Sequence, residues 1–111
     1  MDNAIQVCTT TDSRLSAERI ARELVEAQLA ACVQIGGPVA SVYRWHGKTE
    51  TAEEWTCTIK TVERLYTAVE ARIRELHHYE EPEIVVTTLT GGSETYLHWL
   101  REQVKAGTTS R

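Results

Sequence analysis

The feature that most constrains this chain is a long run of strand-forming residues, Cys32 to Trp45, followed almost at once by a second strand pattern. Gly36-Gly37-Pro38 interrupts the first run, and strand-like residues resume at Val39, which predicts a bend or bulge rather than an end. His46-Gly47-Lys48 indicates a turn, and apolar and polar residues then alternate strictly from Glu54 to Lys60. The two strands are therefore expected to form one long β-hairpin.

The segments on either side of this hairpin alternate between strand and helix patterns. Residues 4–10 alternate with the period of a strand, and residues 15–31 carry apolar side chains every three or four positions, as an amphipathic helix does. After the hairpin we expect a helix from a cap at Thr61 to about His77, and a strand from Glu83 to Leu89. A short last helix is expected between Ser93 and Val104.

This order, βαββαβ with an additional C-terminal helix, predicts an α+β fold of the ferredoxin-like type. In that fold an antiparallel sheet carries both long helices on one face. The 111 residues are few enough for one hydrophobic core, so residues 1–111 are expected to form a single domain. The segment 105–111 has little to bury and is expected to be a flexible tail.

The expected lengths of the hairpin and the helix do not match. A helix over residues 15–31 is roughly 25 Å long, whereas an extended strand over residues 32–45 is roughly 45 Å long, so the hairpin should project by about 15–20 Å. The projecting part carries Tyr43, Trp45 and Trp55, whose rings favour cover from a second copy of the chain, and hence an obligate homo-oligomer. The alternative is that the C-terminal helix of the same chain folds back over the hairpin.

Composition excludes several classes of function. The 12 Lys and Arg residues against 16 Asp and Glu residues leave a net charge of −4, which disfavours nucleic-acid binding. No apolar run is long enough for a membrane span, the first residues lack a secretory signal pattern, and three cysteines do not make a disulfide framework. These features predict a cytosolic protein with free thiols. No nucleophile is paired with a base, which favours a binding protein over an enzyme.

The residues suited to metal binding are Cys8, His77 and, more weakly, His78. A thiolate and an imidazole together suit copper or zinc. A free cysteine is more often a small apolar residue of the core, however, and the residues alone favour that interpretation for Cys8. No CxxC or closed ligand spacing is present, so no metal is expected to be required for folding. Glu80, Glu81 and Glu83 could bind cations or form a solvated loop. The loop is favoured, because carboxylates without a preformed cage bind divalent ions weakly.

Five blocks occur in one order along the chain: LAACVQI (29–35), SVYRWHGK (41–48), Lys60-Thr61, HHYEEPEIV (77–85) and YLHWL (96–100). With these blocks the chain resembles the CutA family of divalent-cation tolerance proteins from about Ile5 to Val104. The resemblance implies a ferredoxin-like subunit, similar to the PII signalling fold, that assembles as a compact homotrimer.

The same resemblance implies tolerance of, or response to, divalent metal ions, copper in particular, by binding rather than by catalysis. Family copper ligands carry over to Cys8 and His77. The family's usual His-Pro-Tyr is His77-His78-Tyr79 here, and Leu76 stands where a further histidine is found, so one histidine of the family's pair is absent or displaced. The missing ligand would have to come from His78, water or a neighbouring subunit.

Two other functions stay open at this point. One is a PII-like signalling or interaction module that binds a small ligand or a partner protein in clefts between subunits. Those clefts are expected to involve Tyr43, Trp45, Trp55, Tyr79 and Glu83. The other is a stable trimer with a structural role and no ligand.

Overall fold

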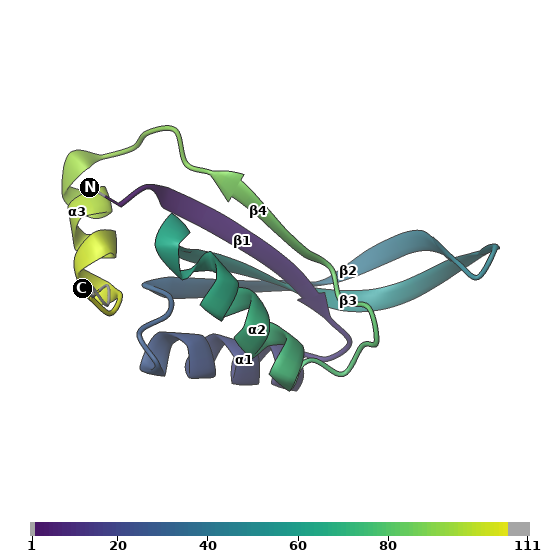
Figure 1. Cartoon of the computed structure of the whole chain (residues 1–111). Coiled ribbons are helices and arrows are strands. Elements are labelled where there is room, and N and C mark those ends of the chain that lie inside the picture. Colours follow the sequence, from purple (N-terminus) through teal and green to yellow (C-terminus); the bar gives the residue numbers. More distant parts are fainter. Residues whose placement is uncertain (1, 107–111) are drawn as a thin grey trace.

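The computed structural model describes residues 2–106. Its elements (Figure 1) are β1 (Ala4–Thr11), α1 (Arg14–Glu26), β2 (Cys32–Trp45), β3 (Lys48–Val62), the 3₁₀ turn η1 (Glu63–Leu65), α2 (Tyr66–Leu76), β4 (Ile84–Thr88) and α3 (Glu94–Gln103). The expected order of strands and helices is confirmed. The expected flexible tail lies largely outside the described residues, since only Lys105 and Ala106 of it are included.

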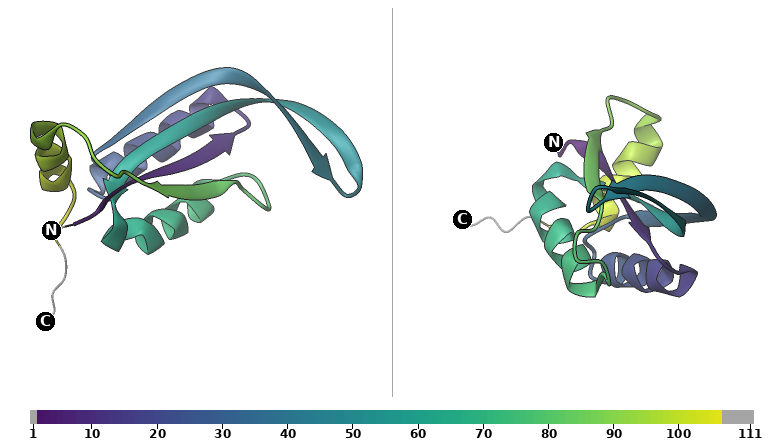
Figure 2. Two further views of the ribbon diagram at one scale, coloured as in Figure 1. Left: turned by 90° about the horizontal axis from the view of Figure 1, so that it is seen from above. Right: turned by 90° about the vertical axis from the view of Figure 1, so that its right-hand side faces the viewer.

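The four strands form one sheet in the order β2-β3-β1-β4, and every neighbouring pair is antiparallel. Helices α1 and α2 cover one face of this sheet, and the other face stays open (Figures 1 and 2). Their apolar stripes meet the inward-facing residues of the central strands. The residues of this core that are fully enclosed include Val7, Ile20, Leu24, Ile59, Val69 and Ile73. Each such side chain contributes about 1.5–3 kcal/mol by leaving water, which makes this layer the main source of the chain's stability.

Helix α1 ends five residues earlier than its periodicity predicts. It stops at Glu26, and Gln28 adopts a left-handed conformation with φ of 59°, after which the Leu29 N–H donates to the Leu24 carbonyl. The prediction of a helix up to Ala31 was therefore wrong. A left-handed residue after a helix is usually glycine, so the glutamine at this position did not indicate that the helix ends here.

The predicted cap at Thr61 was also wrong. Thr61 is a buried residue of β3, and its hydroxyl donates a 2.7 Å hydrogen bond to the Leu29 carbonyl. Helix α2 begins only at Tyr66, after the 3₁₀ turn. Helices α1 and α3 are capped by Ser13 and Ser93, since each hydroxyl accepts from the backbone N–H three residues later.

Residues 39–53, which we call the distal arm, are the projecting part of the hairpin. The register shifts between Gly36 and Val39, as a bulge requires, and the arm turns at His46 and Gly47, whose φ angles of 51° and 78° fit a two-residue turn. Lys48, expected in the turn, is the first residue of β3.

The distal arm extends past both helices (Figure 1), and none of its residues is buried. The molecule accordingly measures 47 × 29 × 25 Å, with a radius of gyration of 14.9 Å, against about 13 Å for a compact domain of this length. The predicted projection of the hairpin is therefore present.

Helix α3 does not cover the distal arm. It lies at the opposite end of the sheet (Figure 1), where Leu100 is fully buried and Val104 nearly so. The alternative in which this helix shields the hairpin of its own chain was therefore wrong, because the two are at opposite ends of the molecule. None of the helices within residues 2–106 is long and apolar enough to cross a lipid bilayer.

Candidate functional site

A cavity of about 490 Å³ lies between the distal arm and the loop 77–83 that joins α2 to β4, beside the end of β1, and it reaches from Glu54 at the base of the arm to Trp45 next to the arm's turn. Three of its lining residues are aromatic. Tyr43 and Trp45 come from the arm, and Tyr79 comes from the loop. We call this the arm-base cavity.

The other walls of the arm-base cavity are strongly acidic. Glu54 of β3 and Glu80, Glu81 and Glu83 of the loop line it, together with His78 and Thr10, whereas no lysine or arginine among residues 2–106 does. The glutamates that the sequence favoured as a solvated loop therefore border a concave surface, and they share it with a carboxylate from a distant strand.

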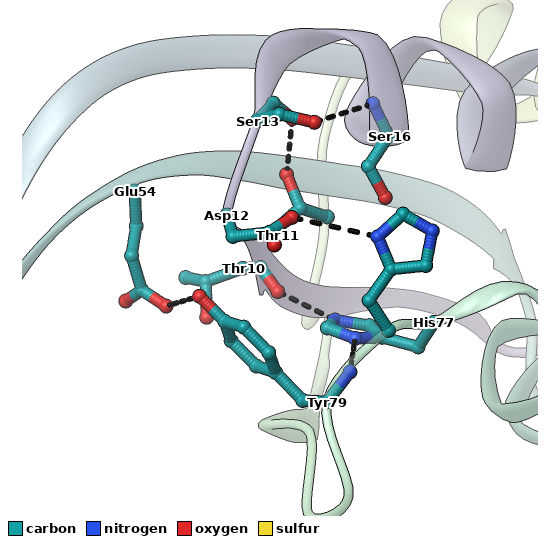
Figure 3. Close-up of polar contacts among 9 residues, drawn as sticks. Thr10, Thr11, Asp12, Ser13, Ser16, Glu54, His77 and Tyr79 are labelled. Carbon is teal, nitrogen blue, oxygen red and sulfur yellow. Dashed lines mark hydrogen bonds and ion pairs between the residues drawn. The ribbon is translucent and has the colours of Figure 1, made fainter.

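Glu54 is the unusual member of this group, because it is only 8% exposed. One carboxylate oxygen, Oε2, accepts a 2.7 Å hydrogen bond from the Tyr79 hydroxyl (Figure 3). Within residues 2–106 no Lys, Arg or His nitrogen lies within 4 Å of this carboxylate. A buried carboxylate is ordinarily paired with a cation or bound to a metal, so this one lacks its usual compensation.

Tyr79 responds to the same surroundings. Its pKa is raised well above the ordinary value, first because burial disfavours the phenolate and then because its hydroxyl donates to the Glu54 carboxylate, whose negative charge acts in the same direction. The hydroxyl therefore stays protonated at neutral pH and acts as a donor toward Glu54.

His77 holds the loop onto β1. Its Nδ1 accepts from the Tyr79 backbone N–H at 3.1 Å, which assigns the proton to Nε2, and Nε2 lies 2.6 Å from the Thr10 carbonyl oxygen to which it donates (Figure 3). In this arrangement neither ring nitrogen has a free lone pair. A metal ion could bind His77 only by displacing one of these two hydrogen bonds.

The other two predicted metal ligands lie elsewhere. Cys8 is half-buried on the open face of the sheet, and the Gln6 side-chain nitrogen lies 3.9 Å from its sulfur. His78 is exposed, with Nδ1 3.7 Å from an Asp12 carboxylate oxygen. Within the described residues, no three His, Cys, Asp or Glu side chains are grouped so that they could hold a metal ion. Cys8, His77 and His78 of one chain therefore do not form a ready ligand set.

The residues predicted for a ligand cleft lie closer together than the predicted metal ligands do. Tyr43, Trp45, Tyr79 and Glu83 all line the arm-base cavity. Trp55 does not, because it lies on the opposite side of β3 from Glu54 and packs against the core beside the bulge at Gly37. Glu54 was not predicted as a site residue. Its place in a strictly alternating strand suggested a solvent-facing residue, whereas in the structure it is buried and hydrogen-bonded to the distant Tyr79.

Comparison with known proteins gives a consistent result. Residues 5–103 match the family model described as CutA1 divalent ion tolerance protein. The chain is 40% identical to the divalent-cation tolerance protein CutA of Thermus thermophilus over 96 residues, which cover 86% of this chain and 93% of that protein. It is 34% identical to the chloroplastic protein CutA of Arabidopsis thaliana over 92% of this chain, but it spans only 56% of that longer relative.

The fold is shared with solved structures as well. The crystal structure of CutA1 from Oryza sativa superposes with a TM-score of 0.92 at 33% identity, over 96% of this chain and 97% of that one. The similarity therefore extends over nearly the whole chain.

Proposed function

The chain belongs to the CutA1 divalent ion tolerance protein family, and on this premise we propose that it acts in the response to divalent metal ions as a homotrimer that binds them without catalysing a reaction. The observation that carries this proposal is the match of residues 5–103 to the family model. We further propose that it works in the cytosol, where its three cysteines would stay reduced.

The surface of the single chain supports assembly. On the distal arm, Val42 is 68% exposed, and Tyr43 and Trp45 are 44% and 43% exposed. Val85 and Val86 of β4 are exposed in the same way. Strands β2 and β4 are the two edges of the sheet, and open edges are where strands of another copy can add. Three copies would cover the exposed valines, which a single chain leaves in water, and would leave Tyr43 and Trp45 at clefts between the subunits.

The metal proposal centres on Cys8. Of the three predicted ligands it has the softest donor atom, and it lies on the open face with no strong partner. A soft cation such as copper favours a thiolate, which the open face leaves accessible. We propose that His78, water or a neighbouring copy completes the coordination, while His77 remains bound to Thr10 and Tyr79.

Light scattering on the purified protein tests the assembly. We expect a mass of three chains for the wild type and a smaller mass for Val42→Asp, because a carboxylate would have to be buried against another copy. Leu15→Asp is the matched control, since Leu15 is 76% exposed and belongs to α1 instead of the arm. A wild type with the mass of one chain would contradict the proposal.

Titration with Cd²⁺, a soft divalent ion that does not oxidise thiols, tests the metal site. The near-ultraviolet absorption of a cadmium–thiolate bond should appear in the wild type and be lost in Cys8→Ser. Cys32→Ser is the matched control, because Cys32 is also a half-buried free thiol of the sheet. An unchanged signal in Cys8→Ser would remove Cys8 from the site, and Cu²⁺ can then be compared in the same variants.

The arm-base cavity supports a second candidate function, the binding of a small ligand. Four residues predicted for such a cleft line one cavity of about 490 Å³, which is within the range of small-molecule sites. A screen for compounds that raise the unfolding temperature tests this function, since any ligand of the folded state stabilises it.

A further inference from the structure

We propose that the arm-base cavity binds an organic cation, specifically a quaternary or otherwise alkylated ammonium group. This inference rests on the second candidate function and names the chemical class of its ligand. It follows from two features that the cavity combines: aromatic walls and carboxylates without cationic partners.

The aromatic walls are the first feature. Tyr43, Trp45 and Tyr79 approach the cavity from two segments that are distant in sequence, the distal arm and the loop 77–83. The face of an aromatic ring carries partial negative charge, so rings gathered around one space attract an alkylammonium group while their apolar surfaces contact its methyl groups. An inorganic ion with a tightly held hydration shell gains much less from such walls.

The charges are the second feature. Four glutamates line the cavity without any lysine or arginine, and Glu54 is nine-tenths buried with only the neutral Tyr79 hydroxyl as its donor. His78 also lines the cavity, and its Nδ1 lies 3.7 Å from an Asp12 carboxylate oxygen. A bound cation would compensate the buried carboxylate of Glu54, which is the partner that residues 2–106 do not provide.

The geometry favours an organic over a metal cation. A hard divalent ion requires several oxygen ligands within about 2.6 Å, and within residues 2–106 no three carboxylates or imidazoles are arranged in this way. The cavity volume of about 490 Å³ is also far larger than a bare ion needs, and it suits a group with several carbon atoms.

Choline and its neutral isostere 3,3-dimethyl-1-butanol test the proposal directly, because they share shape and differ in charge. We expect choline and tetramethylammonium to bind the full chain and to change the fluorescence of Trp45, with isothermal titration calorimetry as the second readout. Choline should bind at least about tenfold more tightly than the isostere, the size of effect that a cation–π contact supplies. Equal binding of the two compounds, or no binding of either cation, would overturn the proposal.

Variants then locate the site. Trp45→Leu should weaken choline binding by about tenfold, whereas Trp99→Leu should not, because Trp99 is similarly exposed but lies on α3 at the other end of the molecule. The double variant Glu81→Gln and Glu83→Gln keeps every ring of the arm and should weaken binding as well, more strongly at low salt. Light scattering on each variant separates loss of binding from loss of assembly.

The outcomes distinguish this inference from the function on which it rests. If a neutral or anionic compound raised the unfolding temperature through Trp45 and Glu83 while choline did not, the cavity would remain a ligand site and the organic cation would be wrong. If Mg²⁺ or Cu²⁺ alone bound through the glutamates, the organic cation would likewise be wrong. If no compound bound, both proposals would fail.

Discussion

The two halves of the β2–β3 hairpin have the same backbone pairing and very different surroundings. In the half nearest the core, Cys57 and Ile59 of β3 are fully buried beneath the helices. In the distal arm, residues 39–53 pair just as regularly, yet none of them is buried. A two-stranded ribbon that is held by strand pairing alone is only marginally stable in water. The first half is stabilised further by burial under the helices of its own chain, whereas the second half requires contacts from outside the chain.

The candidate site lies where these two halves meet. Glu54 follows directly on the arm, and its buried carboxylate accepts a hydrogen bond from Tyr79 of the loop 77–83. Tyr43 and Trp45 belong to the exposed half. A ligand or a second copy that ordered the arm would therefore act on the cavity directly, because the arm supplies two of its aromatic walls.

The largest effect that separates the two halves is expected from large-to-small substitutions. Ile59→Ala should lower the free energy of unfolding by about 2–5 kcal/mol, because Ile59 is fully enclosed and its removal leaves a cavity. Val42→Ala should cost no more than about 0.5 kcal/mol at low protein concentration, since Val42 is 68% exposed within the chain. Urea denaturation measures both.

Repeating these measurements at several protein concentrations separates the two variants further. The cost of Ile59→Ala should be similar at every concentration, whereas that of Val42→Ala should increase as assembly becomes favourable. Equal costs for the two variants in the dilute protein would show that the distal arm is shielded within one chain, contrary to its exposure.

The next largest effect is a pH dependence of stability, which reports how well the half of the hairpin nearest the core (the inner half) excludes water. Burial raises the pKa of the Cys57 thiol from 9.0 to about 11. Below pH 9 the thiol is protonated in both states and has no effect, but between pH 9 and 11 the unfolded chain loses this proton and the folded chain keeps it. Stability should therefore fall as the pH rises through this window, by about 2 kcal/mol from this group.

Cys57→Ala isolates the contribution of the thiol. Wild type and variant are compared by urea denaturation at pH 8 and pH 10.5, so that the titration of the tyrosines cancels in the difference. The variant should lose less stability than the wild type over this interval. A parallel decline of the two proteins would mean that Cys57 is accessible to water in solution.

The junction between the two halves is tested by Tyr79→Phe, which removes one hydroxyl and keeps the ring. Glu54 would then be buried without its only hydrogen-bond donor, and we expect a loss of about 1–2 kcal/mol. Glu54→Gln combined with Tyr79→Phe should cost less than the sum of the two single changes, because each single change removes the same bond. Additive costs would indicate that the hydrogen bond contributes little to stability.

Much of this contrast could be predicted from the sequence, because the features that produce it are local. The period-2 alternation up to Lys60, the bulge at Gly36-Gly37-Pro38 and the separation of the two strand patterns by a glycine-containing turn determine the hairpin's length. The length of the helical segments could be estimated in the same way, although α1 proved shorter. The projection of the arm follows from comparing these lengths.

The arm-base cavity could be predicted only in part. Tyr43, Trp45, Tyr79 and Glu83 were expected to lie together, whereas the hydrogen bond of the buried Glu54 comes from Tyr79, 25 residues away. The two hydrogen bonds that occupy His77 depend in the same way on where the loop meets Thr10. Such contacts have no local signature, because they arise from packing between elements that are remote in sequence.

The smallest expected effect concerns three buried hydroxyls of the inner half. Thr11 and Thr61 donate 2.7 Å hydrogen bonds to the Ser13 and Leu29 carbonyls, whereas the Thr9 hydroxyl has no partner within residues 2–106. Thr9→Val, which keeps the shape of the side chain, should therefore raise the free energy of unfolding by about 1 kcal/mol. Thr61→Val should lower it by about 1 kcal/mol, because the Leu29 carbonyl would lose its donor. Urea denaturation of the two variants decides the point. If Thr9→Val were as destabilising as Thr61→Val, the Thr9 hydroxyl would have a partner in solution, and the helix-covered half of the sheet would be wetter than its burial indicates.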